Sequence, residues 1–233
     1  MRRLLLLLFL VLSSCDGGGN VSKDEAAKNQ ARSEDVRFTD AMNRGVGLMG
    51  RFQFSKAQEH FARALEIDPY SLDAQLDLAI ARLNQVDAGA QEDAIREFAR
   101  ILERKPANAT ANYCTGLAHL YLGHPREALP HLRGLAARHT HDPYLAYFLG
   151  QALEQSDLFQ EACDMYERSL SLDPFLRSSW LGLQRCNARL GKTHLADGAL
   201  KKFEALSGNP RSRLAEFRYS RMGSLAMAVL PDD

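Results

Sequence analysis

The sequence predicts an all-α protein built as an α-solenoid, and three observations support this prediction. Residues 52–69 (FQFSKAQEHFARALEIDP) resemble residues 157–174 (DLFQEACDMYERSLSLDP), which begin 105 residues later. Alanines recur at positions 57, 94, 128, 162 and 196. The chain is also rich in Ala, Leu, Glu and Arg, which favour helices. A chain repeats itself in this way when each unit buries its core only against its neighbours.

The bulk composition excludes some classes of partner. The 233 residues include 29 basic and 29 acidic residues, and 45% of the residues are hydrophobic. A balanced charge gives no general attraction to nucleic acid or to an anionic lipid surface. We therefore expect no nucleic-acid partner.

The N-terminus has the features of an export signal. Two arginines at residues 2–3 precede nine apolar residues, 4–12, which are too few to cross a bilayer. The sequence LSSC at residues 12–15 resembles the bacterial lipobox, in which small residues precede a cysteine that is lipidated and becomes the new N-terminus. We predict a lipoprotein signal peptide at residues 1–14 and lipid attachment at Cys15. An ordinary signal, cleaved or uncleaved, is the alternative.

Residues 15–37 are predicted to be the lipidated cysteine and a flexible tether. Residues 16–35 contain three glycines in a row and no large apolar residue except Val21, although the later part can be helical. The lipobox implies two or three acyl chains, which suffice for stable anchoring. The expected location is the bacterial cell envelope, facing the periplasm. Asp16 favours the inner membrane by the rule for enterobacterial lipoproteins, and the outer membrane is the alternative.

From Phe38 onward a period of 34 residues organises the chain. The recurring alanines are separated by 37, 34, 34 and 34 residues. An earlier position of each unit has nearly the same spacing and is mostly small: Gly45, Ala79, Gly116, Gly150 and Gln184. The three extra residues fall in the second unit, where NQVDAGAQED can form a longer loop.

A 34-residue unit with these small and bulky positions resembles the tetratricopeptide repeat, a helix–turn–helix that stacks into a right-handed superhelix. The resemblance covers residues 38–210, as about five units: 38–71, 72–108, 109–142, 143–176 and 177–210. It implies that the small residues let the two helices of a unit approach closely. The fifth unit departs most, with Gln184 at the small position and Gly208 in place of the closing proline.

Residues 211–233 are predicted to form a capping helix and a tail. Apolar residues at helical spacing could form a buried face in residues 211–230, and they are Leu214, Phe217, Met222, Leu225 and Val229. A repeat array needs such a cap, because its last unit otherwise exposes apolar surface.

The residues that could carry chemistry do not form a catalytic pattern. The glycines at 17–19 lack the lysine of a phosphate-binding loop, and no nucleophile is paired with a base. His139, His141 and Asp142 could bind a metal, but they fall at a junction of units, where polar turn residues are expected. We therefore expect no enzyme, cofactor or metal.

Three cysteines remain beside Cys15. Cys163 and Cys186 fall on helices that pack together in such stacks. The sequence allows either a disulfide between these two cysteines or buried free thiols. With the disulfide, Cys114 would stay unpaired.

The functional surface implied by the resemblance is the concave face, which is lined by the first helix of each unit. The repeat register places there Met42, Asn43, Asp73, Leu76, Asp77, Tyr113, Tyr121, Tyr144, Tyr147, Phe148, Gln151, Gln155, Arg185 and Arg189. The five aromatic residues could form a groove that binds a peptide, or they could pack between helices. Acidic residues at one end and basic residues at the other would orient a ligand.

These observations predict a membrane-tethered scaffold or adaptor that binds a protein or peptide in its concave groove. Cell-envelope assembly is the expected setting, because pilotin, outer-membrane assembly and hydrolase or protease adaptor lipoproteins share this architecture. The alternative is the docking arm of a larger secreted enzyme or sensor system whose catalytic domain lies elsewhere.

Overall fold

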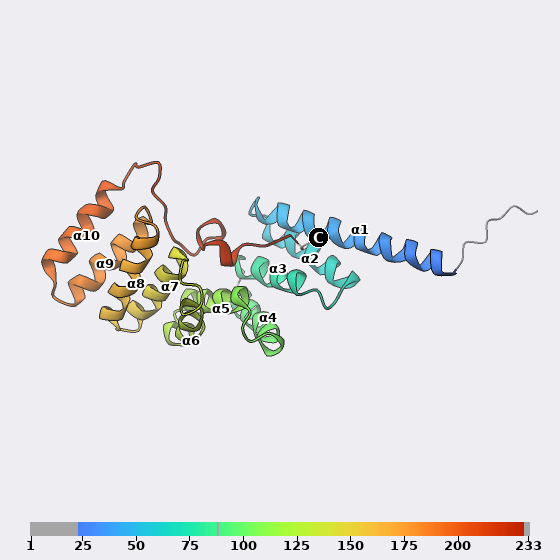
Figure 1. Ribbon diagram of the computed structural model, residues 1–233, viewed down its shortest axis with the longest axis horizontal. Helices are drawn as coiled ribbons and strands as arrows, with labels where there is room; N and C mark the ends of the chain where they lie inside the picture. Colours follow the sequence, from blue (N-terminus) through green and yellow to red (C-terminus); the bar gives the residue numbers. More distant parts are fainter. Residues whose placement is uncertain (1–22, 88, 231–233) are drawn as a thin grey trace, which may run out of the picture.

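The computed structural model describes residues 23–87 and 89–230. Within these residues, ten α-helices are joined by short turns and followed by two 3₁₀ turns, so the predicted α-solenoid is confirmed. Figure 1 shows the helix pairs stacked from α1 and α2 on the right to α9 and α10 on the left. The elements are α1 Lys23–Met49, α2 Phe54–Ile67, α3 Leu72–Leu83, α4 Ala90–Arg104, α5 Ala109–Tyr121, α6 Pro125–Ala136, α7 Pro143–Gln155, α8 Phe159–Leu172, α9 Arg177–Arg189, α10 Thr193–Ala205, η1 Tyr219–Arg221 and η2 Ser224–Ala226.

The small residues of the repeat lie where the two helices of a unit meet. A Cβ atom added at Gly45 would lie 2.4 Å from the ring of Phe61, and one at Gly150 would lie 2.9 Å from the ring of Tyr166. In each pair the bulky side chain comes from the second helix, 16 residues later. Glycine is therefore required at these crossings because a larger residue would collide with the ring.

The turn between the two helices of each unit contains a residue with positive φ. Three units use Gly89, Gly123 and Gly191, whose φ angles are 83°, 76° and 72°. The other two place Phe52 (φ 58°) and Asp157 (φ 63°) at the same position. A bulky aromatic residue in the left-handed region is strained, so Phe52 is the exceptional member of this series.

Helix α1 is longer than the first unit requires. It begins at Lys23, so the segment predicted as a flexible tether is helical from that residue to residue 37. The side chains of residues 25–37 are all exposed, and burial begins near Phe38. No helix in the described part of the chain is long and apolar enough to span a bilayer. The predicted signal peptide (1–14), lipid attachment at Cys15 and the retention signal at Asp16 lie outside the described residues.

The predicted C-terminal capping helix is wrong. Residues 211–230, which we call the strap, contain no α-helix: their two 3₁₀ turns are joined by irregular backbone with bends. Figure 1 shows the strap, in red, turning back from α10 along the solenoid toward α2 and α3. An extended chain advances about 3.3 Å per residue and a helix only 1.5 Å, so a non-helical chain can pass more units than a helix with the same number of residues. Gly223 (φ 89°, ψ 170°) also has a non-helical backbone.

Candidate functional site: the concave groove and its strap

The strap joins the groove at the turn between α8 and α9. Arg213 pairs with Leu176 in a short parallel β-bridge. Its N–H donates to the carbonyl of Phe175 over 2.9 Å, and its carbonyl accepts from the N–H of Arg177 over 2.8 Å. Its guanidinium group lies 3.0 Å from a carboxylate oxygen of the buried Asp173. The backbone of the strap is thus fixed to the array at its entry.

The next residues of the strap contact α9 and α5. The N–H of Ala215 donates to the hydroxyl of Ser178 over 3.0 Å, and this hydroxyl lies 3.1 Å from the carbonyl of Ala215, to which it can donate. The ring of Phe217 stacks on the ring of Tyr121, with their centroids 4.4 Å apart. One polar and one aromatic contact therefore hold the strap on the first helices of the fifth and third units.

Tyr219 fixes the shape of the strap and its contact with the first unit. It is buried, and its ring meets that of Phe54 edge-on with centroids 5.8 Å apart. Its hydroxyl accepts the N–H of Ala228 over 2.9 Å. An ion pair between Arg221 and Glu216, 2.8 Å long, closes the loop around it. The strap is folded upon itself at this point.

The centre of the strap lies against the tyrosines of α5 and α7. The hydroxyl of Tyr113 donates to the carbonyl of Met222 over 2.6 Å, and both side chains are fully buried. Burial holds the pKa of Tyr113 well above its usual value, so this hydroxyl keeps its proton. A Cβ atom at Gly223 would lie 2.8 Å from the Cβ of Tyr144. At this position of the strap only glycine leaves room for the side chains of Tyr113 and Tyr144.

The end of the strap reaches a buried carboxyl group on α3. The N–H of Val229 donates to Oδ1 of Asp77 over 3.1 Å, whereas Oδ2 of Asp77 has no hydrogen-bond partner within the described residues. Burial raises the pKa of Asp77 to about 8, the hydrogen bond from Val229 lowers it, and Asp73 raises it further. At neutral pH, Asp77 is therefore mainly an uncharged acid when the strap is in place.

The predicted aromatic groove residues fall into two groups. Tyr121 and Tyr144, together with Tyr113, contact the strap. Tyr147 and Phe148 are buried and pack between helices: the ring of Phe148 lies 6.2 Å from that of Tyr113, and the two neighbours lie 5.0 Å apart. From the sequence, packing between helices was the alternative to a peptide groove. That alternative describes Tyr147 and Phe148.

Of the four charged residues predicted to orient a ligand, two make internal contacts. At the acidic end, Asp77 is buried and its pKa is raised to about 8. At the basic end, the guanidinium group of Arg185 donates to both carboxylate oxygens of Glu154, over 2.5 and 2.7 Å. Arg189 is exposed and lies 6.0 Å from the ring of Phe159. Two of the predicted charges therefore serve internal contacts.

The remaining predicted groove residues are spread over several environments. Met42 and Leu76 are buried in the core. Asn43 and Gln155 are exposed, whereas Asp73 and Gln151 are half-buried.

The other candidate residues have structural roles. All three cysteines of the described chain are buried free thiols, and Cys114 lies under the strap, its sulfur 3.9 Å from the carbonyl oxygen of Leu225. His139 and His141 are exposed in a turn, and Asp142 caps the N-terminus of α7. No group of three potential metal ligands occurs in the residues that the structure describes.

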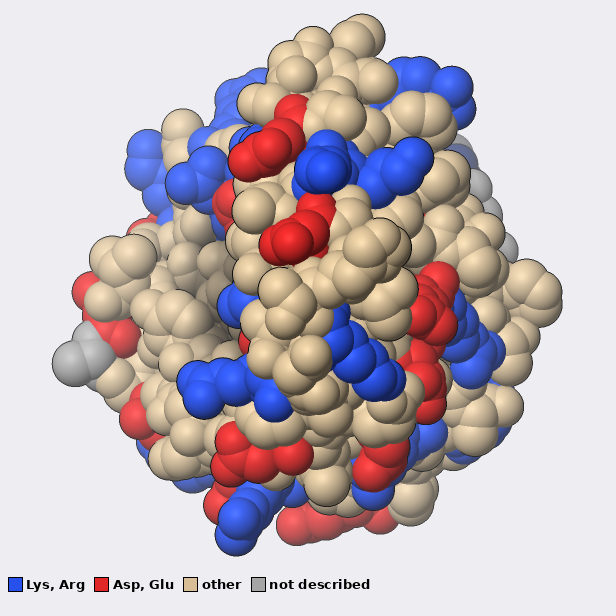
Figure 2. All heavy atoms as spheres, turned by 90° about the vertical axis from the view of Figure 1, so that its left-hand side faces the viewer, with Lys and Arg blue, Asp and Glu red and all other residues tan. Residues whose placement is uncertain are grey.

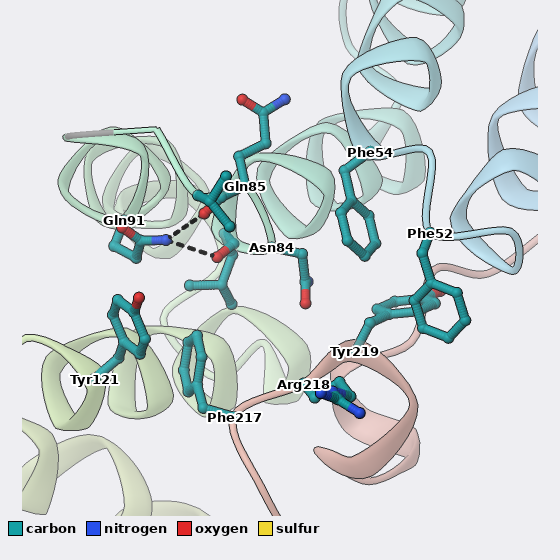
Figure 3. Close-up of a pocket in the computed structure, with 11 residues that line it drawn as sticks. Phe52, Phe54, Asn84, Gln85, Gln91, Tyr121, Phe217, Arg218 and Tyr219 are labelled. Carbon is teal, nitrogen blue, oxygen red and sulfur yellow. Dashed lines mark hydrogen bonds between the residues drawn. The ribbon is translucent and has the colours of Figure 1, made fainter.

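A cavity of about 350 Å³ lies between the strap and the first two units, and sequence reasoning missed it. Figure 3 shows Tyr121 and Phe217 on one side and Phe52, Phe54 and Tyr219 on the other. At the left of the view, the amide of Gln91 in α4 donates to one carbonyl group at the end of α3 and to one in the α3–α4 loop. The strained Phe52 is 53% exposed here. The sequence did contain one signal for this site: Phe52 occupies the turn position at which three other units have glycine.

The open surface has no patch of a single charge at the α10 end. Figure 2 shows this end, with basic and acidic side chains interspersed over an uncharged background. The apolar side chains Leu195 and Leu200 of α10 are exposed, because no capping helix covers them. Charge alone therefore selects no partner on this face.

The fold defines a class of protein, the α-solenoids built from stacked helix pairs. Residues 113–176 match the sequence profile of the tetratricopeptide repeat. No curated protein matches the chain in sequence.

Particular solved structures share this fold. MamA from Desulfovibrio magneticus RS-1, residue 41 to the end, has a TM-score of 0.67 and 20% identity, covering 76% of this chain and 98% of that one. MamA labelled MSR-1 has a TM-score of 0.63 and 21% identity, covering 74% and 98%. MamA labelled AMB-1 has a TM-score of 0.62 and 22% identity, covering 75% and 94%. At these identities the similarity shows the fold alone.

Proposed function

We propose that the protein is a membrane-tethered scaffold that binds a protein or peptide partner in its concave groove and acts in bacterial cell-envelope assembly. The observation that carries this proposal is the occupied groove. An extended polypeptide is seated there, and its backbone is hydrogen-bonded by side chains of α3, α5 and α9. A groove that binds one extended segment in this way is suited to binding another.

The proposed tether rests on the sequence of residues 2–15, with its basic start, apolar run and lipobox-like cysteine. Lipidation at Cys15 would join the array to a membrane through two or three acyl chains. The long exposed first half of α1 would then separate the array from the lipid surface.

Site-specific photocrosslinking in intact cells tests where a partner binds. A benzophenone side chain replaces Tyr121, which is 54% exposed at the groove, or Tyr70, which is 79% exposed in the α2–α3 turn. We expect a defined adduct with an envelope protein from position 121 and none from position 70. Adducts from position 70 alone would contradict the groove as the binding site. A secreted enzyme or sensor in the adduct would instead support the docking-arm alternative.

Fractionation tests the tether separately. Cys15→Ala is expected to release the protein from the membrane fraction or to leave an unprocessed precursor. A Cys15→Ala protein that stays in the membrane fraction at the mature size would show that the lipoprotein prediction is wrong.

A further inference from the structure

The strap contributes apolar residues to the hydrophobic core, but much of its polar contact with the array resembles that of a bound extended peptide. Hydrogen bonds to its backbone come from side chains on the first helices of units two, three and five, in addition to the backbone β-bridge at Arg213. The sequence separation of these contacts reaches 152 residues, from Asp77 to Val229. They can therefore form only after the units that build the groove have stacked.

The groove recognises a short and specific part of the strap. Met222 and Ala226 are fully buried, and the carbonyl of Met222 accepts from Tyr113. Gly223 fits because a Cβ atom there would meet Tyr144 at 2.8 Å. The groove thus selects an apolar residue, then glycine, then a small apolar residue three positions further on.

The structure leaves space beside the strap in which a partner chain could compete with it for the groove. The cavity between the strap and the first units keeps apolar side chains open to solvent, with Phe52 at 53% and Val86 at 96% exposure. The linker between α10 and the strap turns at Gly208, which has φ 79° and no atoms near its Cβ direction. A partner chain can therefore contact the groove beside the strap before the strap leaves.

We propose that the strap is a built-in competitor and that the partner of the groove is an extended, locally uncharged segment with the Met222–Ala226 pattern: apolar, glycine, two variable residues, small apolar. This inference rests on the proposed function, because it names the kind of segment that the scaffold binds. A tethered segment has an effective concentration of about 1 mM, so a free segment binds well only when the strap is weakened.

The test uses a fluorescein-labelled peptide of residues 214–230 and the full-length protein. Gly223→Ala in the protein places a methyl group against Tyr144 and should release the strap. Gly208→Ala is the matched control, because this residue also has positive φ but has nothing within 4 Å. By fluorescence anisotropy, we expect the Gly223→Ala protein to bind the peptide at least tenfold more tightly than the unaltered and Gly208→Ala proteins.

A second peptide tests the recognition pattern. A peptide carrying Gly223→Ala should bind the released groove at least tenfold more weakly than the unaltered peptide. Equal binding of the two peptides would overturn the assigned pattern.

Hydrogen exchange of the strap amides determines whether the strap has left. Met222→Asp, which buries a charge at a fully buried position, provides a second releasing variant. A strap that stays protected in both variants overturns the proposal, and so does loss of protection throughout the helices. A released strap without tighter peptide binding also overturns it. None of these results changes the outcome of the crosslinking test. Failure of the competitor proposal can therefore be distinguished from failure of the proposed scaffold function.

Discussion

The helical array and the strap are both buried, but their contacts are of different kinds. In the array, a bulky side chain packs on a small residue 16 positions earlier, as Tyr166 does on Gly150. In the strap, backbone groups meet groove side chains 37 to 152 residues away in sequence. The comparison teaches that the array is determined by neighbouring units, whereas the strap depends on a groove that exists only after several units have stacked.

The largest effect should follow from enlarging a small residue of the array. A Cβ atom at Gly182 in α9 would lie 2.4 Å from the ring of Tyr166, so Gly182→Leu should lower the free energy of unfolding by about 3 kcal/mol. Urea denaturation measures this loss. Gly198→Leu in α10, where nothing lies within 4 Å, is the control and should be neutral or slightly stabilising. Equal losses at both sites would contradict the packing rule.

A smaller and local effect is expected in the strap. Tyr113→Phe leaves the buried carbonyl of Met222 without its donor, which costs about 1–3 kcal/mol. Hydrogen exchange should become faster in the strap while the helices of units one and five keep their protection. Tyr70→Phe, in an exposed turn, should change nothing. Uniform acceleration across all helices would show that strap and array unfold together.

The docking of the strap should depend on pH through Asp77. The groups that act on it are Asp73 on α3, Cys114 on α5, and Tyr219 and the N–H of Val229 on the strap, and none of them is a cation. Burial in the folded protein, to which the strap contributes, raises the pKa of Asp77 from 3.8 to about 8, although the N–H of Val229 lowers it. The acid is thus favoured in the folded protein, so the stability that it contributes is greatest below pH 4 and is lost as the pH rises through about 8.

The expected loss of docking is at most about tenfold per pH unit between these limits, in proportion to the strap's share of the burial of Asp77. Hydrogen exchange of the strap amides, corrected for the intrinsic effect of pH, measures it. Asp77→Asn removes the ionisable group and should abolish the slope. A slope that persists in Asp77→Asn would assign the pH dependence to another group.

The smallest effect should come from the turns of the first and fourth units, where a residue other than glycine has positive φ. Asp157→Gly relieves a positive φ and should stabilise the protein by about 0.5–1 kcal/mol. Phe52→Gly relieves the same strain but loses an edge-on contact with Phe54, so its net change should be smaller. Thermal unfolding of both variants measures the difference. A large loss for Phe52→Gly would show that this ring is needed for folding.

Much of the fold could be predicted from the sequence, because the repeat is a local rule. Gly45 and Gly150 lie at the crossings that their spacing indicated. The strap could not be predicted in the same way. Its apolar spacing also fits a helix. The non-helical form is favoured only by contacts with the groove, which several stacked units form together. Gly223 was the one local warning against the helix.

The candidate site was predicted in part for a similar reason. The repeat register placed Tyr113, Tyr121 and Asp77 in the groove, and in the structure each lies on the first helix of its unit and contacts the strap. Register could not distinguish Tyr147, which is buried between helices, from a residue that lines the groove. That distinction depends on side-chain packing, which spacing does not describe.

The exposed part of α1 sets a distance. Residues 25–37 rise 1.5 Å each, so this helical stretch is about 20 Å long. If Cys15 carries lipid, this helix would add about 20 Å to the distance that the array can reach from the membrane. A partner in the aqueous space could then meet the groove directly at that distance from the membrane.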